Sequence, residues 1–422
     1  MRLFNFDVRA VGEAYEASVN LEWEERARAP ARLYFRCSRP LSSDPEAYVN
    51  AFMVAASVPA MVFGEQRLTI DQPVCPLLRQ NLNQALGWIN HWFAFRADSL
   101  ALDVQCRDTA SERSGRRVGA FFSGGIDAWS TFLRNREAFP SSHPGAISEA
   151  IVVVGLQGSV SRANFENAMA WFKPLSNDMQ LQFTGVETNV YSHWMDLDPH
   201  YRIWSKSFNG ASLSSIGHVL SHRLNRVLIA SSDNMSNLEP WGTHPLLDPN
   251  YSSHSLSVIH DGVGSTRLDK TRMVADSELA LNNLRVCDSP VPDGYLNCGT
   301  CEKCTRTMLT LESLGALQRC PTFPYRRLTR EHLLAHGDMR VEFSDYLELV
   351  PGLQAQGRDD LLDGIQQLTR RWRQTDLRGW IKRADNFFLR GALQRHRAQQ
   401  QAAARPVRLA PGSLHQAQKE LH

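Results

Sequence analysis

A serine, two glycines and an aspartate stand where an apolar stretch meets a helical one. The segment "VGAFFSGGIDAWSTFLRN", residues 118–135, reads as a strand, a glycine turn and a helix. Paired glycines let backbone N–H groups approach a phosphate without Cβ interference, and the following helix N-terminus favours anions. Ser123 can donate a hydroxyl group to a phosphate oxygen, and Asp127 can bind Mg²⁺. The segment therefore predicts a phosphate-binding loop; the alternative is a plain glycine turn with a first-turn charge.

Four cysteines crowd into a second stretch. Cys298, Cys301 and Cys304 have the spacing C-x2-C-x2-C, and Cys287 precedes them across a loop rich in Pro, Gly and Asp. Four thiolates suit tetrahedral Zn²⁺ at about 2.3 Å, and Gly299 lets the chain turn between two ligands. We expect a structural zinc knuckle, because four cysteines leave no open position. An iron–sulfur cluster and free thiols are the alternatives; the C-P continuation of ferredoxin runs does not follow here.

The composition describes a globular chain without strong charge bias. The chain has 422 residues, 43% hydrophobic and 21% charged, which predicts two or three domains. The net charge of +2 makes nucleic acid an unlikely class of partner on electrostatic grounds. No apolar run reaches the ~20 residues of a membrane span, and no signal peptide is recognisable. Because half of the eight cysteines are clustered, we expect a cytoplasmic protein with reduced thiols.

Apolar periodicity divides the chain into four stretches. Residues 1–115 predict an α+β N-terminal domain, with strands at 31–38 and 100–107 and helices at 44–61 and 75–93. Residues 116–318 predict the α/β domain that carries both motifs. Residues 319–395 predict a helical C-terminal region, and residues 396–422 lack a core pattern and predict a disordered tail.

Within residues 116–318, short apolar strands alternate with amphipathic helices. This alternation is typical of a doubly wound parallel sheet with helices on both faces. We expect strands at 118–123, 150–156, 181–188, 226–231 and 256–261. We expect helices at 127–135, 162–175, 210–224, 270–281 and 302–315. Ligands bind such sheets beyond the carboxyl ends of the strands, where the glycine turn lies.

The S-G-G-x-D pattern at residues 123–127 resembles the signature of the PP-loop ATP pyrophosphatases. Those enzymes activate a carboxyl or carbonyl oxygen with AMP and release pyrophosphate. Their signature has a second serine after the aspartate, where this chain has Ala128; Ser130, a turn away, is the candidate replacement. The resemblance implies a PP-loop fold and nucleotide binding by Ser123, Gly124, Gly125, Asp127 and Ser130.

The order of the motifs adds a narrower resemblance. The loop, then Lys270, the four cysteines and Arg306 resemble the QueC family of 7-cyano-7-deazaguanine (preQ0) synthases. The match covers residues 116–318, about half of the chain. The added length is similar to that of the larger QueC-like proteins of bacterial anti-phage operons, such as QatC and the accessory proteins of type IV CBASS.

The resemblance implies a ligase that uses ATP, Mg²⁺ and Zn²⁺, with catalytic roles for Asp127 and Lys270. ATP adenylates the carboxylate of 7-carboxy-7-deazaguanine, and a nitrogen nucleophile then displaces AMP. The nucleophile is either ammonia, which leads to the amide and preQ0, or the amine of a protein encoded nearby. The regions that flank the central domain favour a protein acceptor; their alternative use is in homo-oligomer formation or core stability.

Two rival functions remain open. One is another PP-loop chemistry, such as tRNA thiolation or amidation; the other is a non-catalytic nucleotide-binding protein with a decayed loop. Several further side chains are candidates for a binding or catalytic site, and simple packing is the alternative for each. Trp241 suits stacking on a purine-like base, His244 and Asp248 suit proton transfer, and His260, Asp261 and Arg267 lie on a loop that suits an anion.

Overall fold

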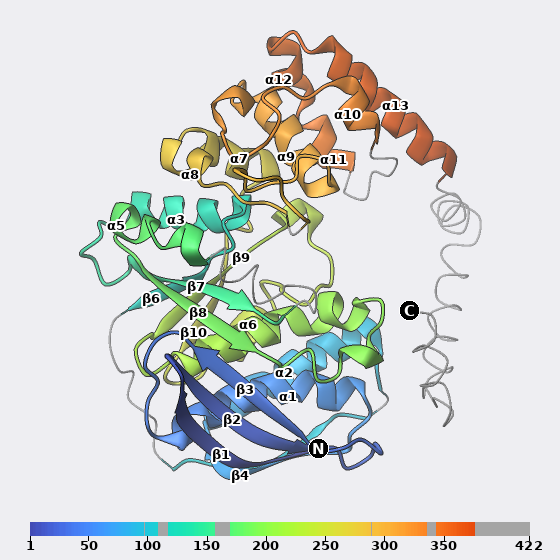
Figure 1. Cartoon of the computed structure of the whole chain (residues 1–422). Coiled ribbons are helices and arrows are strands. Elements are labelled where there is room, and N and C mark those ends of the chain that lie inside the picture. The colour runs from blue at the N-terminus through green and yellow to red at the C-terminus, as the bar shows by residue number, and fades with distance from the viewer. Residues whose placement is uncertain (97, 109–116, 157–168, 288, 336–342, 376–422) are drawn as a thin grey trace.

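The computed structural model describes residues 1–96, 98–108, 117–156, 169–287, 289–335 and 343–375. Ten strands in these residues form one mostly parallel sheet with the order β10-β9-β6-β7-β8-β3-β2-β1-β4-β5 (Figure 1). The strands are β1 (Arg2–Val11), β2 (Ala14–Glu22), β3 (Ala31–Cys37), β4 (Arg67–Val74), β5 (Ala101–Cys106), β6 (Val118–Phe121), β7 (Ile147–Val154), β8 (Gln182–Thr188), β9 (Arg226–Ala230) and β10 (Ser257–Asp261). The helices are α1 (Val49–Val62), α2 (Pro76–Phe93), α3 (Ile126–Ala138), α5 (Leu175–Met179), α6 (Asn209–Val219), α7 (Arg267–Ala275), α8 (Glu278–Asn282), α9 (Glu302–Ser313), α10 (Arg330–Ala335), α11 (Phe343–Leu347), α12 (Val350–Ala355) and α13 (Asp359–Thr375).

The mixed α/β class expected from the sequence is confirmed. All five strands expected in residues 116–318 are present, as β6 to β10, and neighbours among them pair in parallel. The helix expected at 270–281 is two helices, α7 and α8, because Ser277 interrupts it and caps α8. The Ser277 hydroxyl accepts a hydrogen bond from Ala280 N at 3.3 Å. The helix expected at 162–175 falls largely outside the described residues.

The N-terminal strands continue the same sheet. β3 pairs antiparallel with β8, with Phe35 opposite Thr188, and β1 to β3 form an antiparallel meander. β4 and β5 then extend the edge in parallel. Three of these strands, β1, β2 and β4, are additional to those expected from the sequence. The regions on the two sides of residue 115 therefore share a sheet, while the domain boundary there stays a prediction.

Helices cover both faces of the parallel half of the sheet. On β7, Ile151 packs in a core with α1, α2 and α6, whereas Ala150 and Val152 pack in a second core with α3, α5, α7 and α9. Successive side chains of a strand point to opposite faces, so burial of both sets requires a layer on each side. This arrangement is that of a doubly wound sheet.

The C-terminal helices belong to the second core. Leu333, Leu353 and Leu361 from α10, α12 and α13 are fully or almost fully buried in the core that also contains α9. Figure 1 shows α7 to α13 gathered at one end of the molecule. The expected helical region is therefore present as far as Thr375. Residues 376–395 and the predicted tail lie outside the described residues.

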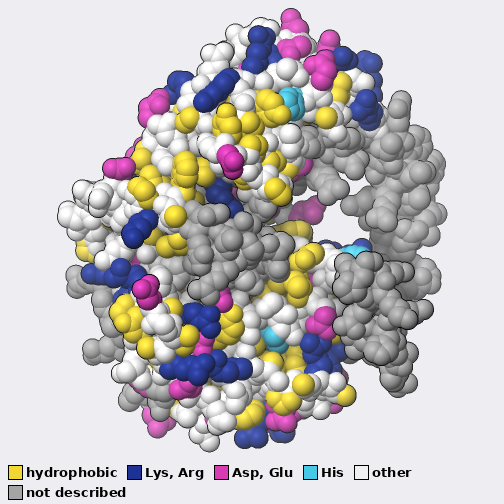
Figure 2. Space-filling model, viewed as in Figure 1, with side chains coloured by type: hydrophobic (Ala, Val, Ile, Leu, Met, Phe, Trp, Pro, Cys, Tyr) yellow, Lys and Arg dark blue, Asp and Glu magenta, His cyan; other side chains and the backbone are white. Residues whose placement is uncertain are grey.

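Arginine side chains cover the exposed face of the N-terminal meander. Figure 2 shows Lys and Arg side chains gathered over β1 to β3. Two of them, Arg32 and Arg36, pair with the buried carboxylate of Glu16 at 2.8 and 2.7 Å. Burial alone raises the pKa of Glu16, but hydrogen bonds from the two guanidinium groups outweigh it and lower that pKa. No helix of the described residues is both long and apolar enough to cross a membrane.

An ion pair on β7 generates a stability prediction. Glu149 is 1% exposed, and its carboxylate accepts hydrogen bonds from Arg223 at 2.7 Å and from the Thr184 hydroxyl at 2.5 Å. We expect Arg223→Ala to lower the free energy of unfolding by about 3–5 kcal/mol, because a buried carboxylate loses its cation. Chemical denaturation followed by circular dichroism measures the change.

The control for this prediction is Arg272→Ala. Arg272 pairs with Asp269 at 3.0 Å, but both side chains are about half exposed. Exposed pairs contribute little, so this variant should change the free energy of unfolding by about 0.5 kcal/mol or less. Equal losses in the two variants would show that burial of Glu149 is not what makes its pairing important.

Candidate functional site

The order of the strands reverses at β6. The chain passes from β6 to β7 on one side and later returns to place β9 on the other side. In open α/β sheets, ligands bind in the crevice beyond the carboxyl ends of the strands at such a switch point. Here the segments that follow β6 and β9 line a cleft of about 610 Å³, a size typical of small-molecule sites.

The predicted phosphate loop forms one wall of this cleft. Gly124 has a φ of +78°, and a Cβ atom there would lie 2.7 Å from the Phe172 ring, so the turn requires glycine. Gly125 precedes the first residue of α3, and its N–H donates to the Ser123 hydroxyl at 3.3 Å. Ser123 and the first turn of α3 line the cleft. The structure thus presents a helix N-terminus to the ligand space, which favours an anion.

Asp127 and Lys270, the two catalytic candidates from the sequence, contact each other. Lys270 Nζ lies 3.3 Å from Asp127 Oδ1, and Arg267 Nη1 lies 3.1 Å from Asp127 Oδ2. Lys270 is 1% exposed and also donates to the Ser231 carbonyl oxygen at 2.6 Å. Burial lowers the pKa of Lys270, and the Asp127 carboxylate partly opposes that shift. Two cations and one carboxylate therefore leave this corner of the cleft net positive.

The start of α7 fixes the two cations. Thr266 and Asp269 form a reciprocal capping box, in which the Thr266 hydroxyl accepts from Asp269 N at 3.2 Å and Asp269 accepts from Thr266 N at 3.1 Å. This pairing determines where the first turn begins. Arg267 and Lys270 stand three residues apart on that turn, so both reach the same carboxylate.

Ser130 does not line the cleft. It is fully buried in α3, and its hydroxyl donates to the Asp127 carbonyl oxygen at 3.0 Å. Ala128 is 6% exposed and is part of the second core. The structure therefore brings the glycine loop, Asp127 and Lys270 together but places Ser130 away from the ligand space. Its role as a replacement phosphate ligand gains no support from this position.

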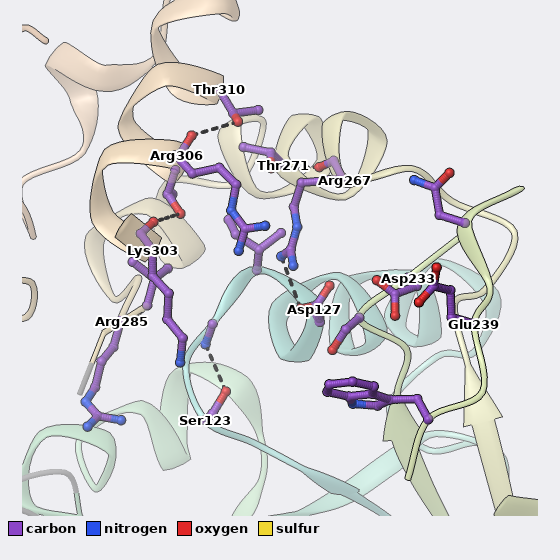
Figure 3. A pocket seen from close by; sticks show the side chains of 17 residues that line it. Ser123, Asp127, Asp233, Glu239, Arg267, Thr271, Arg285, Lys303, Arg306 and Thr310 are labelled. Atoms are coloured by element: carbon purple, nitrogen blue, oxygen red, sulfur yellow. Dashed lines mark hydrogen bonds and ion pairs between the residues drawn. The ribbon is translucent and has the colours of Figure 1, made fainter. Parts of the chain in front are cut away.

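A cationic wall faces the loop, and sequence reasoning missed most of it. Lys303, Arg306, Thr307 and Thr310 on α9 all line the cleft. Their spacing of i, i+3, i+4 and i+7 places them on one face of a helix. Arg285 joins them from the segment before Cys287. Figure 3 shows Lys303 and Arg306 reaching from α9 toward the loop that carries Ser123. The polar stripe directly after the cysteines was the signal available in the sequence.

The opposite wall comes from the segment after β9. Asp233, Asn237, Glu239 and Trp241 line the cleft there, and Trp241 keeps 39% of its surface exposed. Figure 3 shows Asp233 and Glu239 on the side of Asp127 away from Lys303. Burial raises the pKa of Asp233, against the lowering effect of Arg267. Trp241 was a sequence candidate, whereas the two acids were not.

The histidine candidates lie outside the cleft lining. His260 Nδ1 lies 2.8 Å from Asp248 Oδ2, and His244 N donates to Asp248 Oδ1 at 3.3 Å. Asp248 is completely buried, which raises its pKa. Asp261 pairs with Arg134 of α3. These groups therefore brace the loop and the helix, and none of them contacts the ligand space.

The C-terminal region contributes to a small second cavity next to the cleft. Asp345, Tyr346 and Leu349 share a small cavity with Arg267 and Arg306. Burial raises the pKa of Asp345, and the nearby Arg306 acts against that rise. The same two guanidinium groups line the main cleft. The C-terminal region, which is outside the predicted α/β domain, therefore lies beside the two guanidinium groups of the site.

The four predicted metal ligands are assembled. The Sγ atoms of Cys287, Cys298, Cys301 and Cys304 all lie within 4.8 Å of one another, and those of Cys298 and Cys304 are 3.7 Å apart. Tetrahedral zinc with bonds of about 2.3 Å requires sulfur atoms about 3.8 Å apart. Gly299 has a φ of +75°, as the predicted turn between ligands requires. The cluster can therefore hold a metal ion such as Zn²⁺.

Asn297 joins the two chain segments that carry the ligands. Its side chain is fully buried; Oδ1 accepts from Val286 N at 2.7 Å, and Nδ2 donates to Leu284 O at 2.8 Å. Val286 and Asn297 are the direct neighbours of Cys287 and Cys298. Such supporting contacts orient metal ligands. The sequence offered no periodic or spacing signal for this residue.

Comparison of the chain with protein-family models, with curated proteins and with solved structures found no match. The function must therefore be argued from the chemistry of the cleft and of the cysteine cluster.

The cysteine cluster generates a prediction about metal content. We expect one Zn²⁺ per chain by elemental analysis, and we expect Cys301→Ser to lose it together with much of the soluble yield. Thiolate–zinc bonds contribute directly to folding free energy. Cys106→Ser is the matched control, because Cys106 lies outside the cluster, and it should keep its zinc. Stoichiometric iron with visible absorbance would contradict the assignment.

Proposed function

We propose that this chain is a QueC-like ATP-dependent ligase that cleaves ATP to AMP and pyrophosphate. The observation that carries the proposal is the glycine loop at the start of α3, set in a cation-lined cleft at the switch point with Asp127 in its first turn. That combination suits a polyphosphate whose negative charge grows as pyrophosphate leaves. The order of motifs along the chain supports the narrower family assignment.

In this proposal, different residues bind different parts of ATP and its Mg²⁺. The N–H groups of the loop and of the first turn of α3 bind phosphate oxygens, together with the Ser123 hydroxyl. Arg267, Lys270 and the stripe on α9 stabilise the departing pyrophosphate. Asp127 is the carboxylate that would hold Mg²⁺, since Mg²⁺ is usually bound by one or two carboxylates and by substrate phosphates. The bound Mg²⁺ would add charge neutralisation at the phosphates.

The reaction then has two steps. A carboxylate oxygen of 7-carboxy-7-deazaguanine attacks the α-phosphorus of ATP, and the bond to the bridging oxygen breaks to release pyrophosphate. A nitrogen nucleophile next attacks the carbonyl carbon of the acyl-adenylate; AMP leaves with the electrons of the C–O bond, and the nitrogen loses a proton. The first step makes the second possible, because it converts a poor electrophile, the carboxylate, into a good one, the acyl-adenylate.

The zinc ion has a structural role in this proposal. Four cysteine ligands close the coordination shell and leave no position for substrate. Of the four ligands, Cys301 directly precedes α9 and Cys304 lies in its first turn. The metal would therefore fix the position of Lys303 and Arg306 in the cleft.

A non-catalytic nucleotide-binding protein is the second candidate. It is favoured by Ala128 in the position of the second serine and by the Ser130 hydroxyl, which is engaged by the Asp127 carbonyl oxygen. A protein of this kind would bind ATP in the same cleft without cleaving it. Pyrophosphate release separates the two candidates.

The nucleotide chemistry generates the next prediction. With 7-carboxy-7-deazaguanine and an amine source, we expect ATP to yield AMP and pyrophosphate, and we expect Asp127→Asn to abolish the release. Asp276→Asn is the control, because Asp276 is exposed at the other end of α7 and should leave turnover unchanged. Release of ADP and phosphate, or ATP binding without cleavage, would contradict the proposed chemistry.

The acceptor in this proposal is a protein amine. The regions that flank the predicted α/β domain make up about half of the chain, and one of them places Asp345 beside the cations of the cleft. Ammonia needs no docking surface, whereas a protein does. RNA is disfavoured because the net charge of +2 gives the chain little overall attraction to a polyanion. The flanking regions would then orient the acceptor.

The acceptor is tested by mass spectrometry. The full chain is incubated with ATP, 7-carboxy-7-deazaguanine and proteins encoded beside it, and every chain is weighed intact. We expect a neighbour to gain the mass of one 7-deazaguanine acyl group, and the gain to disappear with Asp127→Asn. Efficient formation of free preQ0 from ammonia without any protein adduct would contradict the protein acceptor.

A further inference from the structure

Two arginines and a threonine separate the main cleft from the small second cavity. Arg267, Arg306 and Thr310 line both spaces, and the second cavity has a volume of about 10 Å³. A cavity of that size has room for about one water molecule. A side chain on the far side of this cavity therefore lies close to both guanidinium groups but is separated from the main cleft by them.

The far side of the small cavity belongs to the C-terminal region. Asp345, Tyr346 and Leu349 line the cavity there. Tyr346 and Leu349 are 6% and 3% exposed, and both pack in the second core together with α9, the helix that carries Arg306. Because Asp345 directly precedes the buried Tyr346, core packing determines where its carboxylate lies relative to α9.

Asp345 acts on the two arginines at a longer range than an ion pair. Within the described part of the chain, its carboxylate forms no hydrogen bond or ion pair. Burial raises the pKa of Asp345, and Arg306 and then Arg267 act against that rise. The nearer partners of the guanidinium groups are Asp127, 3.1 Å from Arg267, and Glu302, 3.4 Å from Arg306. Asp345 is therefore a further negative charge beside groups that are already paired.

The cations of the cleft create a problem that such a charge can solve. Arg267, Arg285, Lys303 and Arg306 line the cleft, and Figure 3 shows Arg267 and Arg306 reaching into it. Side chains that stabilise a departing pyrophosphate also retain it as a bound product. Product that is bound as tightly as the transition state leaves slowly, and product release limits the rate of many enzymes. A carboxylate beyond the cationic wall lowers the positive potential without contacting the ligand.

We infer that Asp345 sets the affinity of the cleft for polyphosphate: its carboxylate offsets part of the charge of Arg267 and Arg306 and so allows pyrophosphate to leave. Asp345 does not contact the ligand and acts through the two guanidinium groups. The C-terminal region thereby adjusts a site that residues of the predicted α/β domain build. The inference deepens the proposed function and rests on it for the identity of the anion.

Calorimetry on the full chain, with inorganic pyrophosphate as the probe and no nucleotide present, tests the inference. We expect Asp345→Asn to bind pyrophosphate roughly 3- to 10-fold more tightly than the wild type, because one negative charge near the anion is removed. Asp345→Ala should show the same tightening. Asp345→Glu keeps the charge and should stay close to the wild type.

Asp363→Asn is the matched control. Asp363 is exposed on α13 and lines neither of the two cavities. The substitution changes the net charge of the chain by the same amount as Asp345→Asn, and it should leave the affinity for pyrophosphate unchanged. Equal tightening in the two variants would show that net charge alone is responsible and would overturn the role of Asp345.

The direction of the change separates an effect of charge from one of packing. If Asp345 only held the arginines in place, Asp345→Ala would weaken pyrophosphate binding; that result, or an unchanged affinity in Asp345→Asn, overturns the inference. Failure of both the wild type and Asp345→Asn to bind pyrophosphate also overturns it. Tighter binding by Asp345→Asn, in a protein that never forms pyrophosphate from ATP, supports the inference and contradicts the proposed function. Pyrophosphate formation with unchanged affinity in Asp345→Asn supports the function and contradicts the inference.

Discussion

The site depends on the contacts that the buried ammonium group of Lys270 makes. Removing such a group from water costs several kcal/mol, so it must be compensated where it lies. The compensation comes from the Asp127 carboxylate and the Ser231 carbonyl oxygen. These partners belong to the first turn of α3 and to the end of β9. One buried charge therefore holds α7 against the two segments that define the switch point, and the cleft opens where they meet.

The two walls of the cleft differ in charge as a result. Asp127 cannot neutralise both Arg267 and Lys270, and α9 adds Lys303 and Arg306 on the same side. The wall formed after β9 is acidic and aromatic instead. A low-dielectric cleft strengthens such contrasts in charge.

The cysteine cluster and the C-terminal helices act on the same element. Cys301 directly precedes α9, and Asn297 connects the two ligand-bearing segments by buried hydrogen bonds. Arg306 on α9 lies between the main cleft and the small cavity that contains Asp345. A helix held at its start by thiolates and packed against later helices can keep a row of long cationic side chains in register. The knuckle and the helical region therefore both support the cationic wall.

Much of this molecule could be predicted from its sequence, because the signals involved are local. Strand and helix alternation in residues 116–318, the glycine loop and the four cysteines follow from periodicity, backbone freedom and ligand spacing, which act over a few residues. The tertiary structure alone decided three things. β3 pairs with β8 and extends the sheet to ten strands, and the Ser130 hydroxyl turns inward. Asp233 and Glu239 line one cleft with Trp241, and Arg285 lines the same cleft with α9. These depend on contacts between residues far apart in the chain, where packing and pairing across the fold determine the outcome and no local spacing records it.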